Sequence, residues 1–89
     1  MARNNLSTIY LELGRPEKAV ELLTGALNYS PNDFLCRYNL GLALLRAGQP
    51  SRALEELEQA QRLNPEDADT IALISEARSK LPGQRSDNK

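Results

Sequence analysis

Apolar residues recur three and four positions apart along most of the chain, which is the spacing of one face of an α-helix. Helix-breaking signals interrupt this pattern at four places. They are GRPE at 14–17, SPND at 30–33, GQPS at 48–51 and NPED at 64–67. The pattern therefore predicts five helices, over residues 2–13, 17–29, 32–47, 51–63 and 66–80. Because the loops between them are only two to four residues long, consecutive helices are expected to be antiparallel.

The four breaks alternate between two kinds of signal. Gly14 and Gly48 each precede a proline by two residues. This spacing is typical of a turn in which a glycine in the left-handed region ends one helix and the proline begins the next. At the other two breaks Ser30 and Asn64 are candidate N-caps, each followed three residues later by an aspartate, as in a capping box.

The first 34 residues resemble the next 34. When residues 1–34 are aligned with 35–68, twelve positions are identical. The pairs are Arg3/Arg37, Asn5/Asn39, Leu6/Leu40, Leu11/Leu45, Gly14/Gly48, Pro16/Pro50, Ala19/Ala53, Glu21/Glu55, Leu23/Leu57, Ala26/Ala60, Pro31/Pro65 and Asp33/Asp67. A fixed period predicts a solenoid of stacked units, which acts through its surface rather than through a catalytic cleft.

Two of the expected helices differ in polarity. Helix 51–63 has one apolar stripe, and its charged remainder indicates a solvated outer face, with an acidic docking patch as the alternative. Helix 32–47 is apolar almost all round, so it must be covered by neighbours or present an apolar face to a partner.

Composition excludes several classes of protein. The net charge of −1 and the lack of a basic cluster argue against a nucleic-acid partner. The longest apolar run, residues 40–45, is too short to cross a membrane, and no signal-peptide core is visible. We therefore expect a soluble, cytoplasmic protein. The lone cysteine, Cys36, is expected to be a buried, inert apolar residue.

No residues for catalysis are apparent. The chain has no histidine, and it contains no C-x-x-C, H-E-x-x-H or phosphate-binding glycine motif. We therefore predict that it is not an enzyme and that it uses no cofactor or metal.

The conserved spacing within the two units resembles the tetratricopeptide repeat family. The first unit matches at Leu6, Ser7, Tyr10, Ala19, Leu23, Ala26 and Pro31, and the second at Leu40, Gly41, Leu44, Ala53, Leu57, Ala60 and Pro65. The resemblance implies an all-α, right-handed superhelical stack of antiparallel helix hairpins. It also implies that the small residues Ser7, Gly41 and Ser75 lie at close helix contacts, with Ala19 and Ala53 facing them.

The resemblance divides the chain into one domain and a tail. Repeat one spans 1–33, repeat two 34–67 and a C-terminal capping helix 68–81, so the domain covers 1–81 and residues 82–89 form a disordered tail. The family's first bulky residue is replaced by arginine in both repeats, at Arg3 and Arg37. The cap is expected to present a polar face through Asp69, Glu76, Arg78 and Lys80.

The resemblance also implies a binding surface, because the first helix of each repeat lines a concave groove in this family. The candidate peptide-binding residues are Asn5, Thr8, Leu35, Tyr38, Asn39, Leu42, Leu45, Arg46 and Leu73. The amide of Asn39 would hydrogen-bond a peptide backbone, while Tyr38 and Leu42 would supply apolar anchors. Alternatively, these residues simply pack against neighbouring helices.

The sequence thus predicts a non-catalytic scaffold that binds an unidentified protein segment in this groove. One alternative is a structural or self-associating segment of a longer repeat array, and another is a regulatory appendage of a larger protein. A weak homodimer through the N-terminal edge is also expected, since Leu6, Ile9, Tyr10 and Leu13 cannot all face the second helix.

Overall fold

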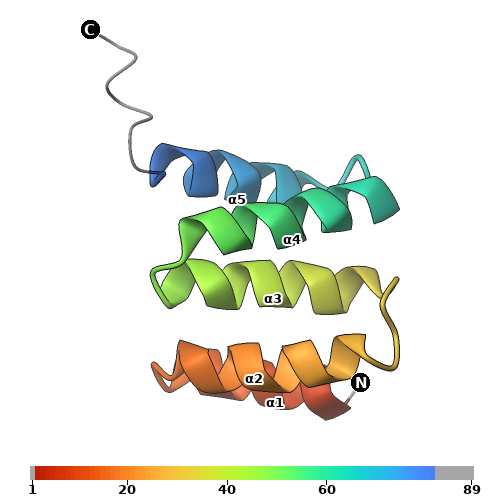
Figure 1. The fold of residues 1–89 in the computed structure, drawn as a ribbon, viewed down its shortest axis with the longest axis vertical. Helices are drawn as coiled ribbons and strands as arrows, with labels where there is room; N and C mark the ends of the chain where they lie inside the picture. The colour runs from red at the N-terminus through yellow and green to blue at the C-terminus, as the bar shows by residue number, and fades with distance from the viewer. Residues whose placement is uncertain (1, 82–89) are drawn as a thin grey trace, which may run out of the picture.

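A computed structural model describes residues 2–81 of the protein, with side chains from residue 6 onward. This part of the chain consists of five helices and contains no strand (Figure 1). The helices are α1 (Ala2–Glu12), α2 (Pro16–Leu27), α3 (Phe34–Arg46), α4 (Pro50–Leu63) and α5 (Ala68–Ser79). Each predicted helix is confirmed, with ends that differ by at most two residues. The predicted tail, 82–89, lies outside the described residues.

The α1–α2 and α3–α4 turns have the same construction. Gly14 and Gly48 adopt φ angles of 75° and 81°, in the left-handed region that favours glycine. One residue later, the backbone N–H of Arg15 donates to the carbonyl of Tyr10 at 2.8 Å, and Gln49 makes the equivalent bond at 2.9 Å. This wrap-around bond ends the first helix. A proline then begins the next helix, as the sequence predicts.

The other two turns correct the predicted N-caps. Asp33 and Asp67 are themselves the caps: their carboxylates accept from the backbone N–H of Cys36 at 3.3 Å and of Thr70 at 2.9 Å. Ser30 instead starts a turn, in which its carbonyl accepts from the N–H of Asp33 at 3.2 Å. The helix begins later than predicted because residues 30–33 form this turn and Asp33, at its end, takes the capping position.

Helix α3 is the centre of the molecule. It contacts α1, α2, α4 and α5, and Figure 1 shows it between the α1–α2 pair and the α4–α5 pair. Six of its thirteen residues are buried: Cys36, Leu40, Gly41, Ala43, Leu44 and Leu45. Neighbours on several sides explain why this segment is apolar almost all round.

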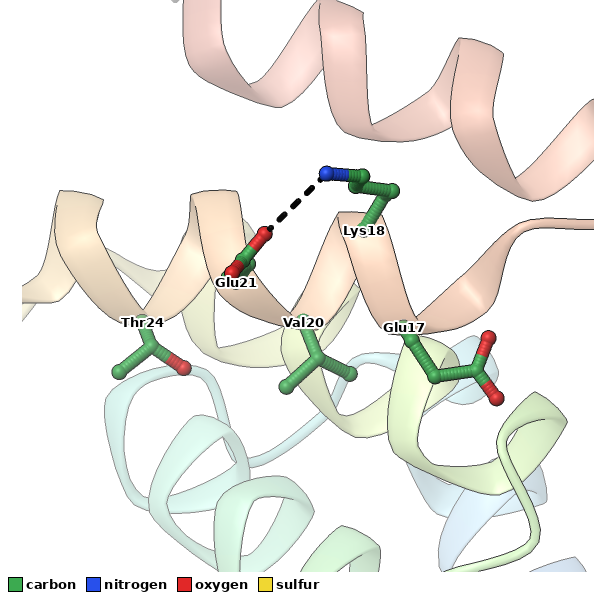
Figure 2. A pocket seen from close by; sticks show the side chains of 5 residues that line it. All are labelled: Glu17, Lys18, Val20, Glu21 and Thr24. Carbon is green, nitrogen blue, oxygen red and sulfur yellow. Dashed lines mark ion pairs between the residues drawn. The ribbon is translucent and has the colours of Figure 1, made fainter.

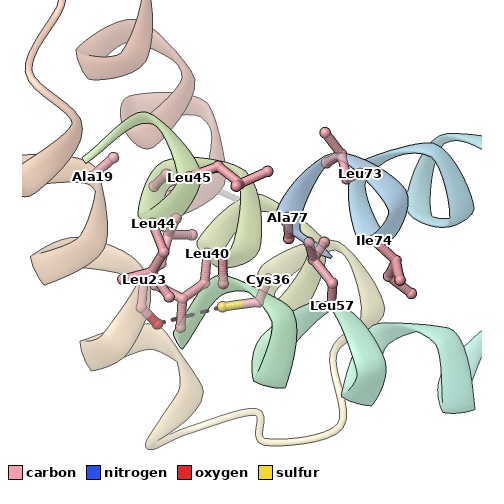
Figure 3. Packing of buried hydrophobic residues seen from close by; sticks show 12 residues of the cluster. Ala19, Leu23, Cys36, Leu40, Leu44, Leu45, Leu57, Leu73, Ile74 and Ala77 are labelled. Atoms are coloured by element: carbon pink, nitrogen blue, oxygen red, sulfur yellow. Dashed lines mark hydrogen bonds between the residues drawn. The ribbon is translucent and has the colours of Figure 1, made fainter. Parts of the chain in front are cut away.

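The core joins residues from both repeats (Figure 3). Leu23 of α2 and Leu57 of α4 are fully buried on opposite sides of α3. Cys36 is 1% exposed, and its thiol donates to the carbonyl of Leu23 at 3.5 Å. The prediction that Cys36 is buried is therefore confirmed.

The nearest contact at Gly41 is made by Leu57. A Cβ atom added at Gly41 would lie 2.5 Å from Cγ of Leu57, and its three nearest atoms all belong to Leu57 rather than to Ala53. A leucine side chain, unlike an alanine methyl group, reaches across to the glycine. A side chain at position 41 would therefore displace this buried leucine.

Candidate functional site

Helices α1, α3 and α5 occupy equivalent positions in the 34-residue period, and α3 contacts both of the others. All nine candidate binding residues lie on these three helices. We refer to the side of these helices on which the exposed and half-buried candidates lie as the α1–α3–α5 face.

Helix α3 supplies the apolar and amide side chains of this face. Tyr38, Asn39 and Leu42 are half-buried, and Leu35 is 48% exposed. The ring of Phe34 stacks on that of Tyr38, with centroids 6.1 Å apart and planes inclined by 28°. Phe34 was not among the predicted site residues, although its spacing of four from Tyr38 is the signal for such a pair on a helix.

Two predicted site residues belong to the core. Leu45 is 6% exposed and Leu73 is 9% exposed, and both lie in the buried cluster. Their side chains are used to pack the helices together, so they offer little surface to a ligand. Thr8 is exposed on α1, whereas the side chain of Asn5 lies outside the described residues.

Charged residues link α3 to α5 at one end of the face. The guanidinium of Arg46 approaches the carboxylate of Glu76 to 3.2 Å, and Nζ of Lys80 lies 3.7 Å from the same carboxylate. These side chains are between one third and just over one half exposed, so each pair contributes little to stability.

Tyr38 lies in a mixed electrostatic environment. Burial raises the pKa of its phenol above the usual value, the carboxylates of Asp69 and Asp67 raise that pKa further, and Arg46 opposes them. The phenol therefore keeps its proton at neutral pH and can donate a hydrogen bond.

Arg37 replaces the bulky residue that the family has at this position. Its guanidinium lies 2.8 Å from the carboxylate of Glu56 on α4, and its Nε donates to the carbonyl of Pro31 at 3.0 Å. Both side chains are only about one fifth exposed. The pair joins α3 to α4 and to the preceding turn, so the arginine has a structural role.

Two shallow hollows lie away from the α1–α3–α5 face. One, of about 480 Å³, is lined by residues of α2 alone: Glu17, Lys18, Val20, Glu21 and Thr24 (Figure 2). The other, of about 360 Å³, lies between α4 and α5 and is lined by Gln61, Ile71, Ile74, Ser75 and Arg78. Sequence reasoning identified neither, because a hollow depends on which neighbouring surface is missing.

The polar face predicted for the last helix is polar only in part. The guanidinium of Arg78 lies 3.8 Å from the carboxylate of Glu58 on α4. Glu58 therefore pairs with Arg78 rather than with Arg62, which is four residues later on the same helix and would be favoured by helix spacing alone. Ile71, however, is 46% exposed on the same helix.

These repeated hairpins define a helical-repeat protein without a β-sheet in the described range. A sequence profile of the tetratricopeptide repeat family matches residues 3–78, which is more than half of the chain. The chain therefore belongs to the tetratricopeptide repeat family, as its spacing predicts. Proteins of this family are generally non-catalytic modules that bind other proteins. No curated protein matches the chain significantly. In the part that the structure describes, no helix is long and apolar enough to cross a membrane.

Proposed function

We propose that this protein is a non-catalytic scaffold that binds a segment of a partner protein on the α1–α3–α5 face. The observation that carries the proposal is the set of half-buried side chains on α3. Tyr38, Asn39 and Leu42 lie on the central helix of the face, and each keeps part of its surface accessible. An aromatic ring, an amide and an aliphatic side chain together can bind an extended peptide.

Each of these residues has a separate role in the proposed complex. The amide of Asn39 hydrogen-bonds the peptide backbone, which makes recognition tolerant of sequence. Leu42 and the stacked rings of Phe34 and Tyr38 provide the apolar anchors. The Arg46–Glu76 pair marks the polar rim, where charge selects the orientation of the segment.

The same proposal includes the finer architecture. The units are repeat one, residues 1–33, repeat two, residues 34–67, and a last helix within 68–81, arranged in a right-handed superhelix. The family match and the equivalent turns at Gly14 and Gly48 support this division. We also propose that the protein acts in the cytoplasm, where its single cysteine stays reduced.

A peptide-display selection tests the proposed binding function. Wild-type protein selects peptides, and the variant Leu42→Glu with Asn39→Ala is used in parallel. The matched control is Thr24→Glu, an exposed substitution on α2 away from the face. We expect peptides that bind wild type and Thr24→Glu about equally but lose affinity for the double variant. Equal binding to all three proteins would contradict the proposal.

Self-association through the N-terminal edge is a second candidate function. Leu6 and Ile9 on α1 and Leu13 directly after it are 41%, 49% and 66% exposed. Two such edges brought together would form a two-fold dimer. Sedimentation velocity over a wide concentration range tests it: wild type should dimerise weakly and Ile9→Glu should not. A wild type that stays monomeric throughout would eliminate the dimer and leave the α1–α3–α5 face unaffected.

A further inference from the structure

Helix α5 has an open side that α1 and α3 do not have. The equivalent small residues of the three helices are Ser7, Gly41 and Ser75. Ser7 is fully buried and Gly41 is buried, because α2 and α4 follow their respective helices and contact them. Ser75 is exposed, since no helix in residues 2–81 covers this side of α5.

The open side contains the hollow of about 360 Å³ between α4 and α5. Ile74 lies in its wall and is 6% exposed, so the hollow continues the buried α4–α5 interface. Ile71 is 46% exposed and also lines the hollow, as does Arg78, whose guanidinium lies 3.8 Å from the carboxylate of Glu58 on α4. The side therefore combines an apolar surface, a small central residue and a positive charge.

The chain shows twice which helix packs on a surface of this kind. Ala19 and Leu23 of α2 are fully buried, and so are Ala53 and Leu57 of α4. In both helices the leucine comes four residues after the alanine, and a second alanine follows three residues later. At Gly41 it is this leucine that fills the space above the small residue.

The difference between α2 and α4 indicates which of the two patterns suits α5. Glu56 of α4 pairs with Arg37, but the residue of α5 equivalent to Arg37 is Ile71. The residue of α2 equivalent to Glu56 is Leu22. An apolar residue like Leu22 complements Ile71, whereas a glutamate there would lose its charge partner.

We propose that the open side of α5 binds an amphipathic helix of a partner protein, with the pattern of α2. The partner helix has two adjacent leucines, like Leu22 and Leu23 of α2. The first leucine packs against Ile71 and the second against Ser75. Alanines lie four residues before and three residues after the second leucine, like Ala19 and Ala26. An acidic side chain pairs with Arg78. A second folded copy cannot supply this helix, because its own Ala19 and Leu23 are fully buried.

Fluorescence anisotropy of the full chain with a labelled peptide tests the proposal. The peptide carries residues 15–28, held helical by a cross-link between positions 24 and 28, both exposed in the chain, so that Glu17 and Glu21 remain free to pair with Arg78. We expect saturable binding that Ile71→Glu and Ser75→Arg each weaken by about tenfold or more. A peptide with Leu22→Glu should bind wild type about tenfold more weakly.

Thr24→Glu is the matched control, since Thr24 is exposed on α2 and receives the same substitution. Its affinity should stay within about twofold of wild type, and circular dichroism should show that all variants keep their helices. Three results would overturn the proposal. They are no saturation at roughly millimolar protein, equal loss of affinity in Thr24→Glu, and self-association that Ile71→Glu abolishes. The last result would assign the open side to a second copy.

Discussion

Helices α3 and α5 occupy equivalent positions in consecutive repeats, yet among the described residues α3 contacts all four other helices, whereas α5 contacts only α3 and α4. Three pairs of equivalent residues show the difference: Leu44 and Arg78, Gly41 and Ser75, and Arg37 and Ile71. Where the neighbouring helix is missing, a buried leucine is replaced by a partly exposed arginine and a buried glycine by an exposed serine. The third pair reverses this trend, because the charged residue lies on the covered helix. Coverage by neighbours, rather than position in the repeat, therefore decides what each residue contributes.

The Leu44 and Arg78 pair should show the largest contrast in stability. Leu44→Ala should lower the free energy of unfolding by about 2–5 kcal/mol, because Leu44 is fully buried and its loss leaves a cavity. Arg78→Ala should change it by about 0.5 kcal/mol or less, since the side chain is 59% exposed. Urea unfolding measures both. Similar losses at the two sites would contradict the difference in coverage.

The Gly41 and Ser75 pair tests the requirement for a small residue. Gly41→Val should cost about 3 kcal/mol, because the new side chain would overlap Leu57. Ser75→Val should cost about 0.5 kcal/mol or less, because no neighbouring helix covers that position. Thermal unfolding of the two variants gives the comparison. If Ser75→Val proved equally costly, α5 would have to be covered in solution.

Arg37 gives a smaller effect that is specific to α3. A double-mutant cycle with Arg37→Met and Glu56→Gln should yield a coupling free energy of about 1 kcal/mol, because the pair is largely shielded from water. The exposed Lys18–Glu21 pair is the control, and its coupling should be about 0.3 kcal/mol. Equal coupling in the two cycles would show that the shielding of Arg37 has no energetic consequence.

The smallest effect concerns the phenol of Tyr38, which faces acidic residues of α5. Burial and the carboxylates of Asp69 and Asp67 raise its pKa. The folded state therefore holds this proton more tightly than the unfolded state, so the stabilisation is present below the unfolded pKa of about 10 and is lost as pH rises through the folded value. The phenolate absorbance of Tyr38 is identified as the signal that is missing from the Tyr38→Phe variant. In the wild type this absorbance should appear only above about pH 10. Titration at or below that value would contradict the described environment.

Much of the fold could be predicted from local signals. Gly14 and Gly48 end helices because of their backbone freedom, and the proline that follows each one begins the next helix. The 34-residue period gave the pairing of helices. The N-caps were less accessible, because Ser30 and Asp33 both have side chains that can cap a helix, and only the three-dimensional turn shows which one does.

The candidate site was harder to predict for a physical reason. Apolar residues at equivalent positions either bind a ligand or fill the core, and the sequence does not distinguish these uses. Leu42 keeps accessible surface, whereas Leu45, three residues later, is buried. The open side of α5 was missed because exposure of Ile71 follows from the absence of a covering helix within residues 2–81.

Amide chemical-shift mapping of the ¹⁵N-labelled 89-residue chain with a display-selected peptide tests the central proposal most directly. Binding on the α1–α3–α5 face should shift Tyr38, Asn39 and Leu42 most strongly, while Val20 and Thr24 on α2 stay unchanged. Shifts confined to α2, or to Ile71 and Ser75 of α5, would contradict the assignment of peptide binding to the α1–α3–α5 face.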